Sequence, residues 1–133
     1  MTKVVTTSGK RKSSIARATV KKGKGTVKIN KTALHVYQPE FARQMIEEPL
    51  TMAEKHVKKI DIRVNVSGGG TMGEAEAVRT AIAKGLVEYT GDAKLKETFT
   101  DYDRTLLVSD IRYKETKKQL GRGARKKRQK SYR

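Results

Sequence analysis

The chain has 133 residues, no cysteine and a formal net charge of +17 at pH 7. Without cysteine it can form neither disulfides nor thiolate metal sites, and no apolar run predicts a membrane span or a secretory signal. The charge lies at the two ends: residues 1–31 carry ten Lys or Arg and no acid, and residues 114–133 carry ten with one acid, Glu115. The span 32–113 has eleven basic and thirteen acidic residues, so we expect the ends to bind a polyanion, above all nucleic acid.

Two strands are predicted near the N-terminus. Small or apolar residues alternate with polar ones over residues 14–21 and again over 26–30, and the glycine-containing stretch 22–25 between them predicts a hairpin. The polar side of both strands carries Lys or Arg. This side is either an ordinary solvated face or a face that contacts phosphates, and the lack of acids in residues 1–31 favours the second interpretation.

Two short helices are expected next. The first should begin at Pro39 and end just before Pro49, because proline is accepted at a helix start but not in its interior. Thr51 and Glu54 have the spacing of a capping box, which predicts a second helix to about Lys58. The apolar side of the first helix should consist of Phe41, Met45 and Ile46.

The clearest strand of the chain spans residues 60–67 and leads into the glycines 68–70. Its apolar side should face the core. A helix follows, with Thr71 and Glu74 at capping-box spacing and Gly91 at its end. The apolar face predicted for this helix consists of Met72, Ala75, Val78, Ile82, Leu86 and Tyr89.

The glycine loop 68–70 is the most distinctive local motif. It lacks the Lys-Ser/Thr of a Walker loop and does not match the dinucleotide fingerprint. Three interpretations stay open: a nucleotide-phosphate loop of an enzyme, a docking point for a nucleic-acid phosphate, or a bare strand-to-helix turn. The two histidines, His35 and His56, have no partner at catalytic or metal-ligand spacing, so we do not expect an enzyme.

The C-terminal part should contain one more helix and an arm. Asp92 is placed to cap a helix on which Leu95, Phe99 and Tyr102 share a face, and residues 105–108 could form a brief strand. Beyond Lys114 the apolar periodicity ends. We therefore predict a globular domain over 1–113 and an extended basic arm over 114–133.

Both basic ends have the composition of RNA-binding segments. Residues 9–14 combine a flexible glycine with three cations and the hydroxyls of Ser13 and Ser14, which we expect to contact phosphate. Residues 121–133 mix cations with small residues and one aromatic, Tyr132. Small residues allow an arm to pass between RNA helices, and an aromatic ring can stack on a base.

Three motifs in this order resemble those of the small-subunit ribosomal protein S-nine family. They are GKRKSSIAR at 9–17, GGGTMGEAEA at 68–77 followed by AIAKG at 81–85, and KSYR at 130–133. The resemblance covers essentially the whole chain, and the arm is more similar to the archaeal and eukaryotic branch than to the bacterial one. One departure is Glu74, where the family pattern has Gln; a carboxylate there weakens contact with a phosphate but would strengthen a capping box.

The resemblance implies a two-layer α/β (α+β) fold with a left-handed crossover, as in the second domain of ribosomal protein S-five. It also implies a non-enzymatic constituent of the cytoplasmic ribosome, located in the small-subunit head on the 3′ major domain of the rRNA. Partners would be rRNA, peptidyl-site tRNA and neighbouring head proteins, with no cofactor, metal, small-molecule substrate or membrane. Carried over by position, the rRNA contacts would be Lys10, Arg11, Lys12, Arg17, Gly68, Gly69, Gly70, Arg122, Arg125, Lys126, Lys127 and Arg128, and the tRNA contacts Lys130, Tyr132 and Arg133.

Two alternatives belong to other functional classes. One is a free-standing architectural protein that coats nucleic acid without specificity. The other is a small phosphate-binding enzyme built on the glycine loop. The first should bind any nucleic acid with similar affinity, and the second should be stabilised by a nucleotide.

Overall fold

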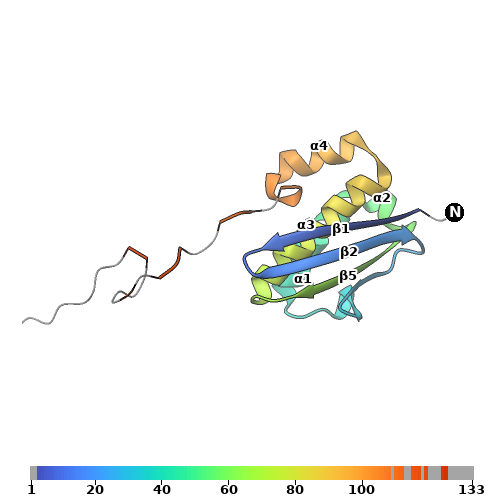
Figure 1. Cartoon of the computed structure of the whole chain (residues 1–133). Helices are drawn as coiled ribbons and strands as arrows, with labels where there is room; N and C mark the ends of the chain where they lie inside the picture. Colours follow the sequence, from blue (N-terminus) through green and yellow to red (C-terminus); the bar gives the residue numbers. More distant parts are fainter. Residues whose placement is uncertain (1–2, 109, 113–114, 118, 120–123, 126–133) are drawn as a thin grey trace, which may run out of the picture.

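The computed structural model describes residues 3–108, 110–112, 115–117, 119 and 124–125. The described part forms a mixed α+β domain, with one open sheet and helices against one face of it (Figure 1). Its elements, in chain order, are β1 (Val4–Arg11), β2 (Ser14–Lys22), β3 (Val27–Ile29), β4 (Thr32–Ala33), the 3-10 helix η1 (Leu34–Val36), α1 (Glu40–Met52), α2 (Glu54–Val57), β5 (Ile60–Ser67), α3 (Thr71–Thr90), α4 (Ala93–Tyr102) and the 3-10 helix η2 (Arg104–Leu106).

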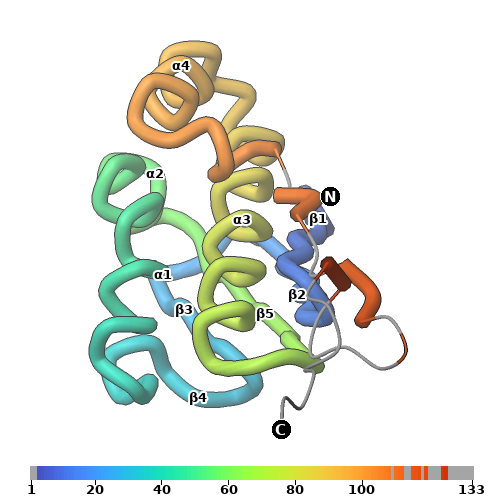
Figure 2. The backbone as a smooth tube through the Cα atoms, turned by 90° about the vertical axis from the view of Figure 1, so that its left-hand side faces the viewer, coloured from blue at the N-terminus to red at the C-terminus, as the bar shows by residue number. Residues whose placement is uncertain are grey.

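The sheet has the strand order β1-β2-β5-β3-β4. All neighbouring strands are antiparallel except β3 and β5, which pair in parallel, so the chain crosses from one to the other through α1 and α2. Helix α3 packs on β1, β2 and β5, and α1 packs on α3, so the helices form a second layer on one side (Figure 2). The predicted two layers are confirmed at this level.

β5 lies at the centre of the sheet, between β2 and β3. Its buried residues are the four apolar ones of the predicted alternation, Ile60, Ile62, Val64 and Val66. The predicted hairpin between residues 14–21 and 26–30 is therefore wrong, although both segments are strands. The strand with the most complete apolar side takes the central position, because there it is paired on both edges and covered by the helices.

β1 was not predicted as a strand. Residues 9–14 read as a flexible basic segment, but Gly9 lies inside β1, directly against α3. A Cβ on Gly9 would collide with the backbone of Ala77 and Ala81. The glycine is therefore needed for close packing of helix on strand rather than for flexibility.

α1 continues through Pro49, so the prediction that the helix ends before this residue is wrong. Ala42, Ile46 and Pro49 are buried on its inner side, and this burial outweighs the hydrogen bond that proline cannot donate. Phe41, predicted on that side, is 52 % exposed. The capping box of α2 does not form, because Thr51 donates its hydroxyl to the carbonyl of Glu47 instead.

α3 follows its prediction closely at the centre and at the end. Ala75, Val78, Ile82 and Leu86 are buried, and Gly91 ends the helix in the left-handed conformation. At its start, however, Gly70 is the N-cap and no side chain caps the helix, so the capping box of Thr71 and Glu74 is wrong. Met72 is exposed and Tyr89 is half-buried.

α4 is capped as predicted, since the carboxylate of Asp92 accepts a hydrogen bond of 2.9 Å from the backbone N–H of Lys94. Leu95 and Phe99 are buried, whereas Tyr102 is exposed. Residues 105–108 do not form the brief strand. The Asp103 side chain caps η2 at this point, which favours a tight helical turn over an extended segment.

Of the predicted arm over 114–133, only residues 115–117, 119 and 124–125 belong to the described part. Within the described residues, no helix has both the length and the apolar character needed to cross a bilayer.

Candidate nucleic-acid interface

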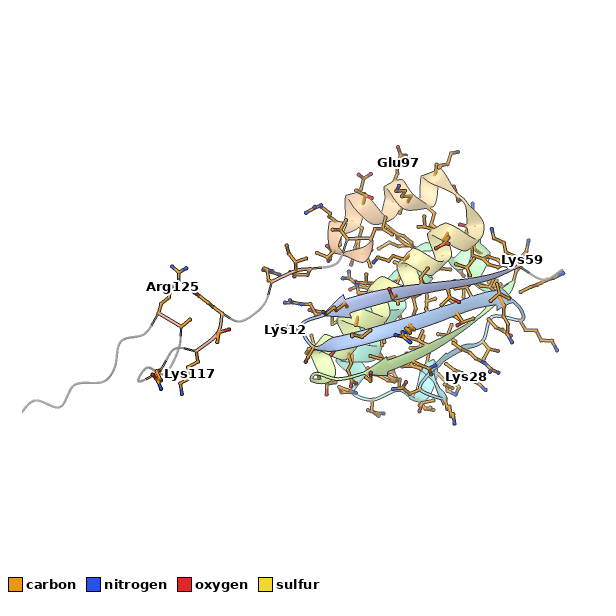
Figure 3. All side chains as sticks on the ribbon, in the orientation of Figure 1. Lys12, Lys28, Lys59, Glu97, Lys117 and Arg125 are labelled. Carbon is orange, nitrogen blue, oxygen red and sulfur yellow. The ribbon has the colours of Figure 1, made fainter. Side chains whose placement is uncertain are left out.

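In the part of the chain that the structure describes, one face of the sheet carries no helices, and its outward side chains come from alternate positions of four strands. Each strand that buries one set of residues presents the other set to solvent. Figure 3 labels one of these, Lys28 on β3. We call this surface the open face; its residues are Val4, Thr6, Ser8, Lys10, Ile15, Arg17, Thr19, Lys21, Lys28, Asp61, Arg63, Asn65 and Ser67.

Two cations of the open face lie directly opposite each other on neighbouring strands, and a third has polar neighbours on both sides. Arg17 of β2 is opposite Ser8 of β1 and Asn65 of β5. Arg63 of β5 is opposite Lys28 of β3. Adjacent strands are about 4.8 Å apart, and like charges directly opposite each other are unfavourable in the free protein. A bound anion removes this repulsion, so the arrangement suits a phosphate chain.

A groove of about 690 Å³ crosses the open face over β2, β5 and β3. The residues that line it are Thr19, Lys21, Lys28, Lys31, Arg63, Val64 and Asn65. Four of these are cations and none is an acid. The groove can therefore accept phosphates from any direction without meeting a repelling carboxylate on its own walls.

Asp61 lies opposite Lys21 in the sheet, but its carboxylate is hydrogen-bonded to the loop between β2 and β3. Its carboxylate accepts hydrogen bonds of 3.0 Å from the backbone N–H groups of Thr26 and Lys24. These hydrogen bonds hold the pKa of Asp61 below its usual value. The carboxylate also occupies the space that a Cβ on Gly23 would need. Asp61 thus fixes the connection from β2 to β3 beside the groove.

The cations of the first motif do not all point the same way. Lys10 and Arg17 lie on the open face, and Lys12 is exposed at the turn between β1 and β2 (Figure 3). Arg11 points to the helix side of the sheet, where its Nε pairs with the carboxylate of Glu76 on α3. Three of the four predicted rRNA contacts of this motif are therefore on the surface, and Arg11 is held inside a protein contact.

The glycine loop packs against the turn between β1 and β2. Gly68 and Gly69 have positive φ values of 81° and 67°, and a Cβ on Gly69 would collide with the hydroxyl of Ser14. Ser14 is buried and donates its hydroxyl to the carbonyl of Gly68 at 2.8 Å. The phosphate contact expected for Ser14 is therefore wrong, whereas Ser13 is exposed.

The start of α3 is accessible at the same end of the molecule. Gly70 has open space around its Cα, and the first turn of α3 has no side-chain cap. Unpaired N–H groups at the start of a long helix attract anions. The contact with Ser13 and Ser14 explains Gly68 and Gly69 without a ligand, whereas Gly70 leaves the start of α3 open to an anion.

Most of the predicted arm contacts lie outside the described residues: Arg122, Lys126, Lys127, Arg128, Lys130, Tyr132 and Arg133. Arg125 is described, and its exposed guanidinium is 3.1 Å from the carboxylate of Glu115. An exposed pair of this kind contributes little to stability.

Sequence reasoning did not include Lys28, Lys31 or Arg63 among the site residues. The alternation of polar and apolar residues placed Lys28 and Arg63 on polar sides of strands, which was the available signal. Their meeting depends on the parallel pairing of β3 with β5, a contact between segments about 35 residues apart. Local patterns do not reveal such a pairing.

Comparison with known proteins supports one family. A family model described as ribosomal protein S9/S16 matches residues 9–133. A small ribosomal subunit protein uS9 from Methanothrix thermoacetophila is 56 % identical over 131 residues, covering 98 % of this chain and 99 % of that protein. Proteins of the same name from Thermoplasma volcanium and Halobacterium salinarum are 54 % and 50 % identical, again over at least 97 % of both chains. The chain therefore belongs to the ribosomal protein S9/S16 family.

Proposed function

We propose that the chain is a structural, non-catalytic constituent of the small ribosomal subunit in the cytoplasm and that its open face binds rRNA. The observation that carries the proposal is the groove over β2, β5 and β3, whose described lining residues include four cations and no acid. Membership of a ribosomal protein family over almost the whole chain supports the same conclusion.

The mechanism is neutralisation of RNA phosphates with release of their counterions. Each phosphate contact lowers the slope of log affinity against log salt by about 0.7–0.9. Lysine and arginine side chains on a flat sheet reach the backbone of an RNA helix but not its base edges in the deep groove. We therefore expect the protein to recognise the shape of a folded rRNA region rather than a base sequence.

The proposal also includes the location of the protein in the subunit, its fold type and the role of its basic arm. The site is the head of the small subunit, on the 3′ major domain of the rRNA and among the other head proteins. The fold is that of the second domain of ribosomal protein S-five, with a left-handed crossover from β3 to β5. The basic arm over 114–133 extends towards the peptidyl-site tRNA, where Lys130, Tyr132 and Arg133 make contact.

The open-face proposal is tested by removing cations from the groove. Arg63→Gln combined with Lys28→Gln should lower the affinity for the rRNA head fragment about tenfold or more. The slope of log affinity against log salt should become shallower by the amount expected for about two phosphate contacts. The matched control is Lys94→Gln combined with Lys55→Gln, because both lysines are exposed on helices away from the sheet. Equal binding of both variants would contradict the proposal.

Crosslinking and footprinting of the full chain in cells separate the alternatives. A single cluster in the rRNA of the small-subunit head supports the ribosomal function. Crosslinks spread over unrelated nucleic acids would favour the architectural protein instead. Stabilisation of the free protein by a nucleotide would favour the enzyme.

The arm has its own test. Deleting residues 130–133 should leave subunit assembly intact and weaken retention of peptidyl-site tRNA. Truncated subunits that hold tRNA as well as complete ones do would contradict this role.

A further inference from the structure

The last residue of β1, Arg11, is the centre of a contact between three parts of the chain. Its Nε pairs with the carboxylate of Glu76 on α3, and its NH1 donates a hydrogen bond of 3.1 Å to the carbonyl of Arg112. Its NH2 lies 3.7 Å from the carboxylate of Asp110. The side chain is only 15 % exposed. One guanidinium thus holds the end of the sheet, the helix layer and residues 110–112 together.

Residues 110–112 are organised around the same point. Asp110 forms an isolated parallel β-bridge with Arg11, beside the end of β1. Its carboxylate accepts hydrogen bonds from the backbone N–H of Arg112 at 3.0 Å and from the guanidinium of Arg112 at 2.6 Å. These hydrogen bonds keep the pKa of Asp110 well below its usual range, so the carboxylate is ionised at any physiological pH.

We infer that Arg11 is a positioning residue, which fixes where and in which direction the C-terminal segment leaves the domain. It is not primarily an rRNA contact. Its charge is offset by the carboxylates of Glu76 and Asp110, and its donors are directed at protein acceptors. The inference rests on the proposed function, because the direction of the segment matters for a target that its far end has to reach.

Holding the first residues of a long segment has a physical benefit. A chain of about twenty residues with no fixed contacts would have a root-mean-square end-to-end distance of about 25 Å. The place that its far end can reach then depends on where its first residues leave the domain. Fixing the origin raises the effective concentration of the tip at a fixed target without any new contact there.

The chemistry requires arginine at position 11. The planar guanidinium offers donors in a fixed fork, which reach Glu76, Asp110 and the Arg112 carbonyl at the same time. The ammonium of lysine keeps the charge but presents a single point of attachment. Arg11→Lys therefore separates positioning from charge.

The test measures the spread of the segment in the full-length protein. The chain has no cysteine, so Glu97→Cys on α4 and Thr116→Cys introduce the only two spin-label sites. Pulsed electron resonance then gives the distance distribution between them. We expect Arg11→Lys and Glu76→Gln each to broaden this distribution about twofold or more. The matched controls are Arg43→Lys and Glu47→Gln, an ion pair on α1 far from the C-terminal segment in sequence.

Arg11→Lys and Glu76→Gln test the same ion pair from its two sides, and Glu76→Gln does so without changing Arg11 itself. Widths equal to that of the parent protein in both variants would overturn the inference. In reconstituted subunits the same variants should lower retention of peptidyl-site tRNA about three- to tenfold, with an unchanged salt slope of rRNA binding. Because Arg11→Lys keeps the charge that sets the slope, a third variant is needed: a salt slope reduced by Arg11→Gln but not by Glu76→Gln would assign Arg11 to rRNA instead.

The outcome is separable from that of the proposed function. If the variants broaden the distribution while deletion of residues 130–133 does not affect tRNA, the positioning role stands and the tRNA role of the arm fails. If deletion weakens tRNA retention while the widths do not change, the arm role stands and the positioning role fails.

Discussion

The two faces of the sheet carry different kinds of side chains. On the face covered by helices, the side chains are small or aliphatic apart from Arg11 at the end of β1, and β1 and β2 use Gly9, Ala16 and Ala18 so that α3 can lie close. On the open face, cations such as Arg17 and Arg63 stand on neighbouring strands with no such packing. The covered face is determined by what fits inside the protein, and the open face has no such packing requirement.

This difference predicts where substitutions act. A change on the covered face alters packing that has no free volume, so its cost appears in the stability of the free protein. A change on the open face removes a solvated side chain, which usually changes stability by no more than about 0.5 kcal/mol. Such a change should lower the affinity for RNA while leaving the stability of the free protein almost unchanged.

The largest effect is expected for Gly9→Ala. The new methyl group would meet the backbone of Ala77 and Ala81, which cannot move without shifting α3. We expect a loss of about 1–3 kcal/mol and a fall in Tm of roughly 5–15 °C, measured by calorimetry. The control is Gly70→Ala, where φ is −96° and an added Cβ would meet no described atom within 4 Å apart from its chain neighbours. Similar Tm values for both variants would show that α3 does not lie this close to β1.

The second largest loss of stability is expected for Glu48→Gln, which removes a partner of a largely buried arginine. Arg79 of α3 is 10 % exposed and pairs with the carboxylates of Glu48 on α1 and Asp103 before η2, at 2.6 Å and 3.2 Å. Glu48→Gln should cost about 1–3 kcal/mol in urea unfolding, because a charge left without a full partner is poorly solvated there. Glu47→Gln, on the outer side of the same helix, is the control. A cost as small as that of the control would mean that water replaces the lost carboxylate.

A smaller effect on the free protein is expected for Arg17→Gln on the open face. Stability should stay within about 0.5 kcal/mol of the parent protein. The slope of log affinity for rRNA against log salt should become shallower by the amount expected for about one phosphate contact. A clear loss of stability would contradict the contrast between the two faces, since Arg17 would then be part of the packing.

The smallest effect is expected for Glu74→Gln. Burial raises the pKa of Tyr37 above 10.0, and the negative charge of Glu74 raises it further. Because the folded state holds this proton more tightly, stability is lost as the pH rises above about 10. Glu74→Gln should lower the pKa of Tyr37 towards its ordinary value, as seen by NMR titration. Assembly should tolerate the change, because Glu74 does not cap α3; a large assembly defect would contradict this.

Features that depend on neighbouring residues were well predicted from the sequence. The alternation in β5, the apolar spacing of α3 and the caps at Gly91 and Asp92 all act within a few residues. The wrong predictions at Pro49 and at the hairpin involved a competing tertiary contact, whereas the two capping boxes failed for local reasons within one helix turn. Pro49 stays inside α1 because its ring is buried, and the expected hairpin is opened by β5.

The candidate site was predicted in part for the same reason. The basic composition of the N-terminal strands and the family motifs indicated RNA, and Lys10, Lys12 and Arg17 do lie on the surface. The side on which Arg11 lies follows from contacts with Glu76 and Arg112, which are 65 and 101 residues away. No pattern within a short window contains this information.

The central position of β5 also has a consequence for synthesis of the chain. The hairpin of β1 and β2 and the pair of β3 and β4 both need β5 to join one sheet, and β5 ends at Ser67. At about 5–20 residues per second, some 2–7 s pass between completion of β4 and completion of β5. An isolated two-stranded hairpin is only marginally stable during this interval. A nascent chain with ten cations and no acid in residues 1–31 is then exposed to every polyanion nearby.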